Sequence, residues 1–223
     1  MPILHIANKN YSSWSLRPWM LMQTLGIPFE ERLHRLGTDF SFSPSRRVPL
    51  LEEGDLRVWD SLAIVETLAE SHPQVWPRDR EARAWARSAA AEMHAGFAVL
   101  RDVCSMSCGQ RVRLPAIPPE LALELARLQV LWQDGLRRFG GPWLAGAAFT
   151  AVDAFYAPVA FRIQTYGLEL GENALAYAAR LRALPAMQAW YADALAEPFR
   201  EDAHDAQVRA AGTILADHRV PVA

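Results

Sequence analysis

Three short stretches of the sequence carry groups suited to holding an anionic, peptide-like ligand. The first is NYSSWSLRPWM at 10–20, which places the consecutive hydroxyls of Ser12 and Ser13 between a short apolar run and a helical one. Serine oxygens at such a junction can cap the orphan N–H groups of a first helical turn. The same hydroxyls can instead donate to an anion held at the helix start. The other two stretches help to decide between helix capping and anion binding.

The second stretch is RRVPLL at 46–51, where Pro49 introduces an apolar strand. Proline cannot donate to a strand ladder, so it belongs at a sheet edge or at the first residue of a strand. A cis Val48–Pro49 bond would leave the main-chain N–H and C=O of Val48 pointing outward, where an extended peptide can add itself as a short strand. An ordinary trans proline at the edge is the alternative.

The third stretch is WDSLAIVE at 59–66, where Asp60 and Ser61 mark the start of a helix. One interpretation is that one of them is simply the N-cap residue. The other is that the helix start and the Ser61 hydroxyl bind a carboxylate, while Asp60 receives an ammonium group. Together, the second stretch would bind a peptide backbone, the third an amino-acid head group, and the first whatever lies between.

The elements that must position these residues alternate between strands and helices over the first 75 or so residues. Hydrophobic alternation and turn signals predict strands at 3–7 and 31–36, two strands about a Glu-Gly-Asp turn within 48–60, and helices at 18–26 and 61–73. The order is therefore β-α-β, a loop, then β-β-α. If the first helix begins only at Pro18, the serines lie in the loop before it.

From about Trp76 the pattern becomes helical. Helices are predicted from 76 to about 104, over 119–140 with apolar residues at steps of three and four, over 148–167, and over 185–198. A loop rich in Gly and Pro occupies 109–119, and no strand is predicted after residue 76. The chain therefore divides into a small α/β domain, 1–76, and an all-helical domain, 82–223.

Composition excludes several classes of protein. The 223 residues are 51% hydrophobic and 22% charged with a net charge of −2, which is typical of a globular protein and gives no electrostatic case for nucleic acid. No apolar run approaches the ~18 residues of a membrane span, and no secretory signal is visible, so we expect a cytoplasmic protein without a membrane partner.

Cys104 and Cys108 fit neither a zinc site nor a CxxC pair and are expected to be buried, inert thiols. No histidine falls in a metal-ligand pattern, so no metal is expected.

FTAVD at 149–153 completes a set of motifs that resembles a known family. Thr150 and Asp153 form a Ser/Thr-x-x-Asp capping box, which we expect to be structural. Val-Pro, Asp-Ser and this box, in this order and spacing over essentially the whole chain, resemble the cytosolic glutathione S-transferases. YSSWS resembles the Ser-Ser-Cys-Ser of the zeta class, so the chain is identified as a bacterial, serine-type, zeta-like member. The resemblance implies an α/β, thioredoxin-like N-terminal domain with a mixed four-stranded sheet, followed by an all-α domain.

The resemblance also implies roles for residues that bind glutathione. Val48 would pair antiparallel with the cysteinyl unit, with Pro49 cis, and Asp60 and Ser61 would hold the γ-glutamyl head group. Arg46 or Arg47 would bind the glycyl carboxylate through charge-assisted hydrogen bonds, or both arginines are merely solvated.

Ser12 is the best match to the thiol-activating serine, with Ser13 as the runner-up. The implied function is a transferase that activates the thiol of glutathione, its co-substrate, for attack on a small electrophile, typically in detoxification and as a homodimer. One alternative is a glutathione-dependent isomerase of maleylacetoacetate type, in which Arg17 and Arg101 receive carboxylates, although Trp14 stands where the zeta class has cysteine. The other is a binding module without turnover. The electrophile is left open.

Overall fold

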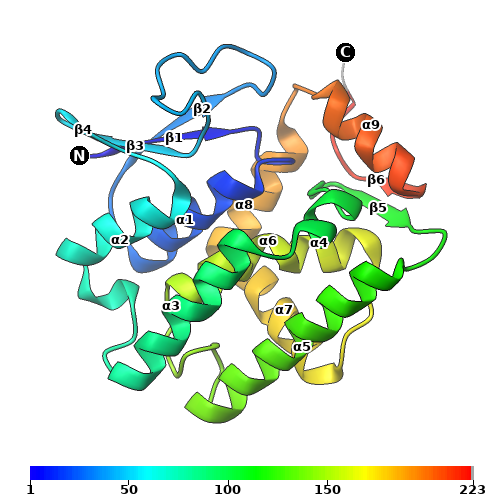
Figure 1. Cartoon of the computed structure of the whole chain (residues 1–223). Coiled ribbons are helices and arrows are strands. Elements are labelled where there is room, and N and C mark those ends of the chain that lie inside the picture. Colours follow the sequence, from blue (N-terminus) through cyan, green and yellow to red (C-terminus); the bar gives the residue numbers. More distant parts are fainter. Residues whose placement is uncertain (222–223) are drawn as a thin grey trace.

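The N-terminal part of the chain is a four-stranded sheet with two helices packed against it (Figure 1). The computed structural model describes residues 1–221. In chain order the elements are β1 (Ile3–Ala7), α1 (Ser13–Leu25), β2 (Glu30–His34), β3 (Leu50–Glu53), β4 (Leu56–Val58) and α2 (Ser61–Ser71). The sheet order is β2-β1-β3-β4, with β1 parallel to β2 and antiparallel to β3. This mixed sheet is the one predicted from the sequence.

The start of the helix predicted over 18–26 is wrong, because α1 begins five residues earlier, at Ser13. It runs from Ser13, with Ser12 as its N-cap residue, and it contains Pro18. Proline lacks the N–H that would bond the carbonyl four residues back, but the buried side chains of α1 are held in the core, where the helix packs against α6. It ends as predicted at Gly26, whose φ of 66° is the left-handed conformation that glycine adopts without strain. The serines therefore belong to the helix start, not to a loop before it.

The remainder of the chain is mainly helical, as predicted. Its helices are η1 (Pro73–Val75), α3 (Arg80–Ala95), α4 (Ala98–Val103), α5 (Pro119–Phe139), α6 (Ala151–Tyr166), α7 (Glu172–Ala183), α8 (Pro185–Ala196) and α9 (Asp202–Ala211). The single helix predicted over 76–104 is instead two, because Phe97 adopts a left-handed φ of 55° that ends the regular path between α3 and α4. Helix α6 is buried on nearly every side and lies at the centre of the helices (Figure 1).

The prediction of no strand after residue 76 is wrong. Strands β5 (Gln110–Arg113) and β6 (Thr213–Asp217) form a two-stranded antiparallel sheet beside α9. β5 falls within the segment predicted as a loop, and it is stabilised by a partner far along the chain. A four-residue strand of this kind has too few residues to show alternation.

The capping box at the start of α6 is present and structural, as expected. The main-chain N–H of Thr150 donates to Asp153 Oδ2 at 2.9 Å, and the other carboxylate oxygen accepts from the N–H of Leu144 and the hydroxyl of Tyr177. Burial raises the pKa of Asp153 to about 6. This carboxylate therefore fixes the start of α6 and has no access to a ligand.

Two further expectations concern the thiols and the membrane. Cys104 and Cys108 are free and fully buried, and burial raises the pKa of Cys104 to about 12, so neither is a reactive thiolate. Among residues 1–221, no helix combines the length and the apolar character needed to cross a bilayer.

Candidate functional site

The predicted site residues gather around two cavities that share part of their walls. The larger, of about 400 Å³, is lined by Ser12 and Ser13 together with groups from the loop before β3, from α4, α6 and α9. The smaller, of about 260 Å³, is lined by Pro49 and Asp60. Trp14, Arg47 and Val48 line both, so the two cavities lie side by side, and together they are called the groove. Its combined size suits a small peptide.

The two serines at the start of α1 differ in their surroundings. Ser12 Oγ is half-buried, makes no side-chain capping bond, and donates to Ser15 Oγ at 2.7 Å. Ser13 is only 6% exposed, and its Oγ accepts a hydrogen bond of 3.4 Å from Arg162 Nη2. Because Ser13 Oγ is an acceptor in this contact, its own proton is free to be donated into the cavity. The Ser12 side chain therefore does not cap helix α1.

The loop before β3 presents main-chain groups and guanidinium groups to the groove. The Val48–Pro49 peptide bond is cis. Val48 is half-buried between the two cavities and, within residues 1–221, its main-chain N–H and C=O have no hydrogen-bond partner. Arg46 and Arg47 are exposed, and both line the larger cavity. This edge is therefore open to a strand-like ligand.

Asp60 acts as a helix cap in addition to lining the groove. Its Oδ1 accepts the N–H of Leu62 at 2.9 Å, and its Oδ2 lies 3.1 Å from His94 Nε2. Burial lowers the pKa of His94. Ser61 is fully buried beside it and is not on the cavity wall, and its Oγ has no hydrogen-bond partner among the described residues. The head-group role of Ser61 thus requires a ligand that reaches this hydroxyl.

Sequence reasoning missed several groups on the wall of the larger cavity, chief among them Arg162 on α6. Arg101 and Arg162 line this cavity together with His204 from α9. The sequence gives Arg101 a role in the isomerase alternative and gives Arg162 none. A possible signal for Arg162 was a charged residue within the otherwise apolar run AFYAPVAFRI, because a charge on a buried helix is rarely without a partner or function.

Trp14 separates the groove from a buried arginine. The guanidinium carbon of Arg17 lies 4.0 Å from the centre of a Trp14 ring and that of Arg101 lies 5.6 Å from it, which are cation–π distances. Arg17 is 1% exposed and does not line either cavity. Trp14 therefore forms part of the groove wall, with the Arg17 guanidinium packed against its ring.

The segment after α8 closes one side of the site. Tyr11 OH donates to Asp205 Oδ1 at 2.9 Å, and Arg219 Nη1 donates to both the Tyr11 hydroxyl and the Asp205 carboxylate at 2.8 Å. Burial raises the pKa of Tyr11 to about 12, so this phenol stays protonated. It anchors α9 to the residue before Ser12.

The charges on the wall favour an anionic ligand. Arg46, Arg47, Arg101 and Arg162 line the larger cavity, against a single carboxylate, Asp102. A concave surface of one sign concentrates ligands of the opposite sign. Within residues 1–221, no group of three or more His, Cys, Asp or Glu side chains is arranged to hold a metal ion.

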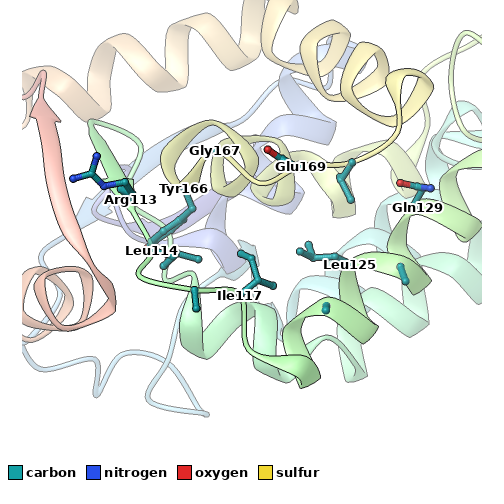
Figure 2. A pocket seen from close by; sticks show the side chains of 12 residues that line it. Arg113, Leu114, Ile117, Leu125, Gln129, Tyr166, Gly167 and Glu169 are labelled. Carbon is teal, nitrogen blue, oxygen red and sulfur yellow. The ribbon is translucent and has the colours of Figure 1, made fainter.

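A larger cavity lies elsewhere in the described part of the chain. It measures about 650 Å³ and is lined mainly by apolar side chains of the loop after β5, of α5 and of the segment that follows α6, including Leu114, Ile117 and Leu125 (Figure 2). It contains none of the predicted site residues. Its one phenol, Tyr166, donates to the Ser105 carbonyl. Its charged lining residues are Arg113 and Glu169.

Comparisons with known proteins show what this chain is similar to. Residues 11–71 match the family model described as "Glutathione S-transferase, N-terminal domain". Glutathione S-transferase theta-3 of Mus musculus is 32% identical over 157 residues, an alignment that spans 60% of this chain and 64% of the mouse protein, less than two thirds of that relative.

Solved structures share the fold at lower identity. A glutathione transferase homolog from Burkholderia gl BGR1 with bound glutathione has a TM-score of 0.66 at 23% identity, covering 86% of this chain and 97% of that one. An epsilon-class enzyme from the housefly, Musca domestica, has a TM-score of 0.68 at 17% identity, covering 95% and 98%. A maleylacetoacetate isomerase from Anaeromyxobacter dehalogenans 2CP-1 has a TM-score of 0.64 at 22% identity, covering 91% and 95%.

The class of protein follows from these findings. The fold is that of the glutathione transferases, with a thioredoxin-like domain followed by a helical one. The family model and the mouse relative support a place in the glutathione S-transferase family. Structures of several classes match about equally well, so the comparisons do not select the zeta-like class.

Proposed function

We propose that this protein is a serine-type glutathione transferase, which binds glutathione in the shared groove and activates its thiol for attack on a small electrophile. The observation that supports this most is the convergence on one groove of the α1 start, with Ser12 and Ser13, and the unpaired main-chain edge of Val48. The domains that would do this are 1–76, for glutathione, and 82–223, whose α4, α6 and α9 complete the wall.

Glutathione would be held along its backbone and at its two ends. The main chain of Val48, next to cis Pro49, would pair with the cysteinyl unit in the manner of an added strand. Asp60 and Ser61 at the start of α2 would hold the γ-glutamyl head group. The unpartnered Ser61 hydroxyl supports this, since a buried hydroxyl is costly without a hydrogen bond.

The other end of glutathione would meet the two arginines of the loop before β3. Arg46 and Arg47 line the larger cavity and are not engaged in any salt bridge within residues 1–221. A guanidinium that binds the glycyl carboxylate would form charge-assisted hydrogen bonds, the strong kind.

The chemistry begins with the thiol. A free thiol of pKa ~8.5 is only a few per cent thiolate at neutral pH, and lowering that pKa by about two units requires ~2.7 kcal/mol of preferential anion stabilisation. A hydrogen bond from Ser12 or Ser13 to sulfur, worth ~1.5–3 kcal/mol, and the α1 start, worth ~0.3–1 kcal/mol, supply this together. The thiol proton leaves to solvent. The sulfur lone pair then forms the bond to carbon, and the leaving group departs with its own electron pair.

The test is an ultraviolet titration of thiolate absorbance for glutathione bound to the wild type, Ser12→Ala and Ser13→Ala. The proposal expects a bound thiol pKa well below that of free glutathione, restored toward the free value by one of the two variants, and that variant identifies the activating serine. Binding without any lowering of the thiol pKa would refute the catalytic role and favour the binding module. Failure to bind glutathione would refute the glutathione site as well.

A second candidate is the isomerase of maleylacetoacetate type. The four arginines on the wall of the larger cavity favour it, because a linear dicarboxylate needs cationic groups at both ends. Trp14, in place of the zeta-class cysteine, weakens it. Comparing turnover of maleylacetoacetate with that of a simple aryl halide separates the two, since only the isomerase would convert the former without consuming glutathione.

The proposal extends to a cytoplasmic homodimer that acts in detoxification of electrophiles. Light scattering at micromolar concentration would test the dimer, with a mass twice that of the 24.9 kDa chain as the expected result.

A further inference from the structure

Arg162 is a buried cation without a carboxylate partner among the residues that the structure describes. It lies on α6, is 4% exposed, and its Nε donates to the Cys104 carbonyl at 2.8 Å. Its Nη2 makes the 3.4 Å contact with Ser13 Oγ, and its Nη1 has no hydrogen bond within residues 1–221. A neutral carbonyl and a neutral hydroxyl are weak compensation for a buried charge.

The charged neighbours of Arg162 are two more arginines, Arg17 and Arg101, which add positive charge and do not compensate its own. Arg17 is completely buried, with Nε and Nη1 lacking hydrogen bonds, and Arg101 uses its guanidinium on main-chain carbonyls of the α3–α4 junction. None of these three arginines forms a salt bridge with a carboxylate in the described part of the chain. The pKa of Arg162 is lowered to about 10, first by burial and then by Arg101, and that of Arg17 to about 9, first by burial and then by Arg162.

Arg162 lines the larger cavity, as do the two serines at the start of α1. It is part of the cavity wall, and the contact with Ser13 Oγ places it at the start of α1. An anion that accepts a hydrogen bond from the Ser13 hydroxyl is therefore within reach of Arg162 as well. Arg162 has N–H groups without an acceptor and no carboxylate partner among residues 1–221. Both observations favour an anion bound in the larger cavity beside Ser13.

We propose that Arg162 is a second catalytic residue of the thiol-activating site, whose guanidinium contacts the sulfur anion of bound glutathione from α6. This rests on the proposed function, and it adds a full positive charge to the hydroxyl and the helix start considered above. The proton lost from sulfur goes to solvent, and Arg162 stays protonated throughout. The helical domain then contributes a positive charge to the activation of the thiol, in addition to completing the wall of the groove.

The experiment measures the pKa of the glutathione thiol bound to wild type, Arg162→Gln and Arg162→Lys, together with the glutathione dissociation constant at a pH where the thiol is protonated. A charged hydrogen bond of ordinary strength corresponds to a shift of about one to two pKa units. We therefore expect Arg162→Gln to raise the bound thiol pKa by that amount, so that the ratio of thiolate to thiol at a given pH falls roughly 10- to 100-fold. Affinity for the protonated thiol should change less than about threefold. Arg162→Lys, which keeps the charge, should recover part of the shift.

Arg182→Gln is the matched control. Arg182 is half-buried on α7, donates to the α6 carbonyl of Ala160 at 3.1 Å, and does not line the groove. Its loss removes a comparable arginine-to-carbonyl bond to α6, so a merely structural effect would appear in both variants. The thiol pKa should be unchanged in this control.

Because Arg162→Gln removes a buried bond to Cys104 and can fail to fold, wild-type protein with ¹⁵N-labelled arginine provides a second measurement. The Nε–H signal of Arg162, assigned by its contacts with Cys104 and Ser13, should titrate with the same midpoint as the bound thiol. A folded Arg162→Gln variant with the wild-type thiol pKa, or a signal that stays constant while the thiol titrates, would overturn this inference alone. Wild-type protein that binds glutathione without lowering its thiol pKa would overturn the proposed function, and with it this role.

Discussion

Asp205→Ala tests how far the segment after α8 stabilises the loop that carries the serines. Asp205 is 8% exposed and accepts hydrogen bonds from Tyr11 OH and from Arg219 Nη1. The variant leaves Arg219 with Asp217 as a partner, whereas the Tyr11 hydroxyl loses its acceptor. Hydrogen bonds to a charged group are worth ~1.5–3 kcal/mol each, and they are not additive within one cluster. We therefore expect the free energy of unfolding to fall by about 3 kcal/mol.

The local effect of Asp205→Ala is expected in the turn before α1, at residues 8–12. The N–H groups of Tyr11 and Ser12 both donate to the Asn8 carbonyl, at 3.1 and 2.9 Å. A loss of about 3 kcal/mol corresponds to a roughly 100-fold rise in the open population, since each tenfold change is about 1.4 kcal/mol. Urea unfolding should report the global loss, and native-state hydrogen exchange should show the Ser12 amide exchanging ~10- to 100-fold faster.

Asp202→Ala is the control for this prediction. Asp202 is exposed in the first turn of the same helix, so its removal costs only the helix-dipole contribution of ~0.3–1 kcal/mol. If Asp205→Ala is destabilised no more than Asp202→Ala, or if the Ser12 amide exchanges at the wild-type rate, the contact with Tyr11 does not hold the loop and the reasoning fails.

Other predictions concern three buried groups. Ser61→Ala should leave stability unchanged or raised, since its hydroxyl has no partner in the described structure, yet weaken glutathione about 10-fold in calorimetry, and equal affinities would contradict the head-group role. The pKa of Asp153 rises from 3.8 to about 6 on folding. Wild-type stability should therefore fall by about 2 kcal/mol relative to Asp153→Asn as pH increases from 4 to 6.5, and parallel urea-unfolding curves for the two proteins would refute this. Cys104 should resist a thiol reagent until the protein unfolds, and labelling at the rate of free cysteine in the folded protein would contradict its burial.

The sequence alone determined the parts of the structure that depend on neighbouring residues. The β3–β4 hairpin, helix α2 and the end of α1 at Gly26 follow from apolar spacing and turn chemistry within a few residues. The Thr150–Asp153 capping box spans only one helical turn, so its hydrogen bonds could be predicted from its four-residue pattern. Asp60 as a helix cap is a local feature of the same kind.

Only the tertiary structure decided which distant residues share the groove. Ser13 and Arg162 are 149 positions apart, and they meet because α1 packs against α6. Tyr11 and Asp205 are 194 positions apart, and β5 is a strand only because β6 pairs with it. Such contacts are selected by the burial of whole helix faces, which no short window of sequence contains. The end of α1 could therefore be predicted from its neighbours, whereas its start at Ser13 and the charge placed beside the serines depend on the packing of the entire chain.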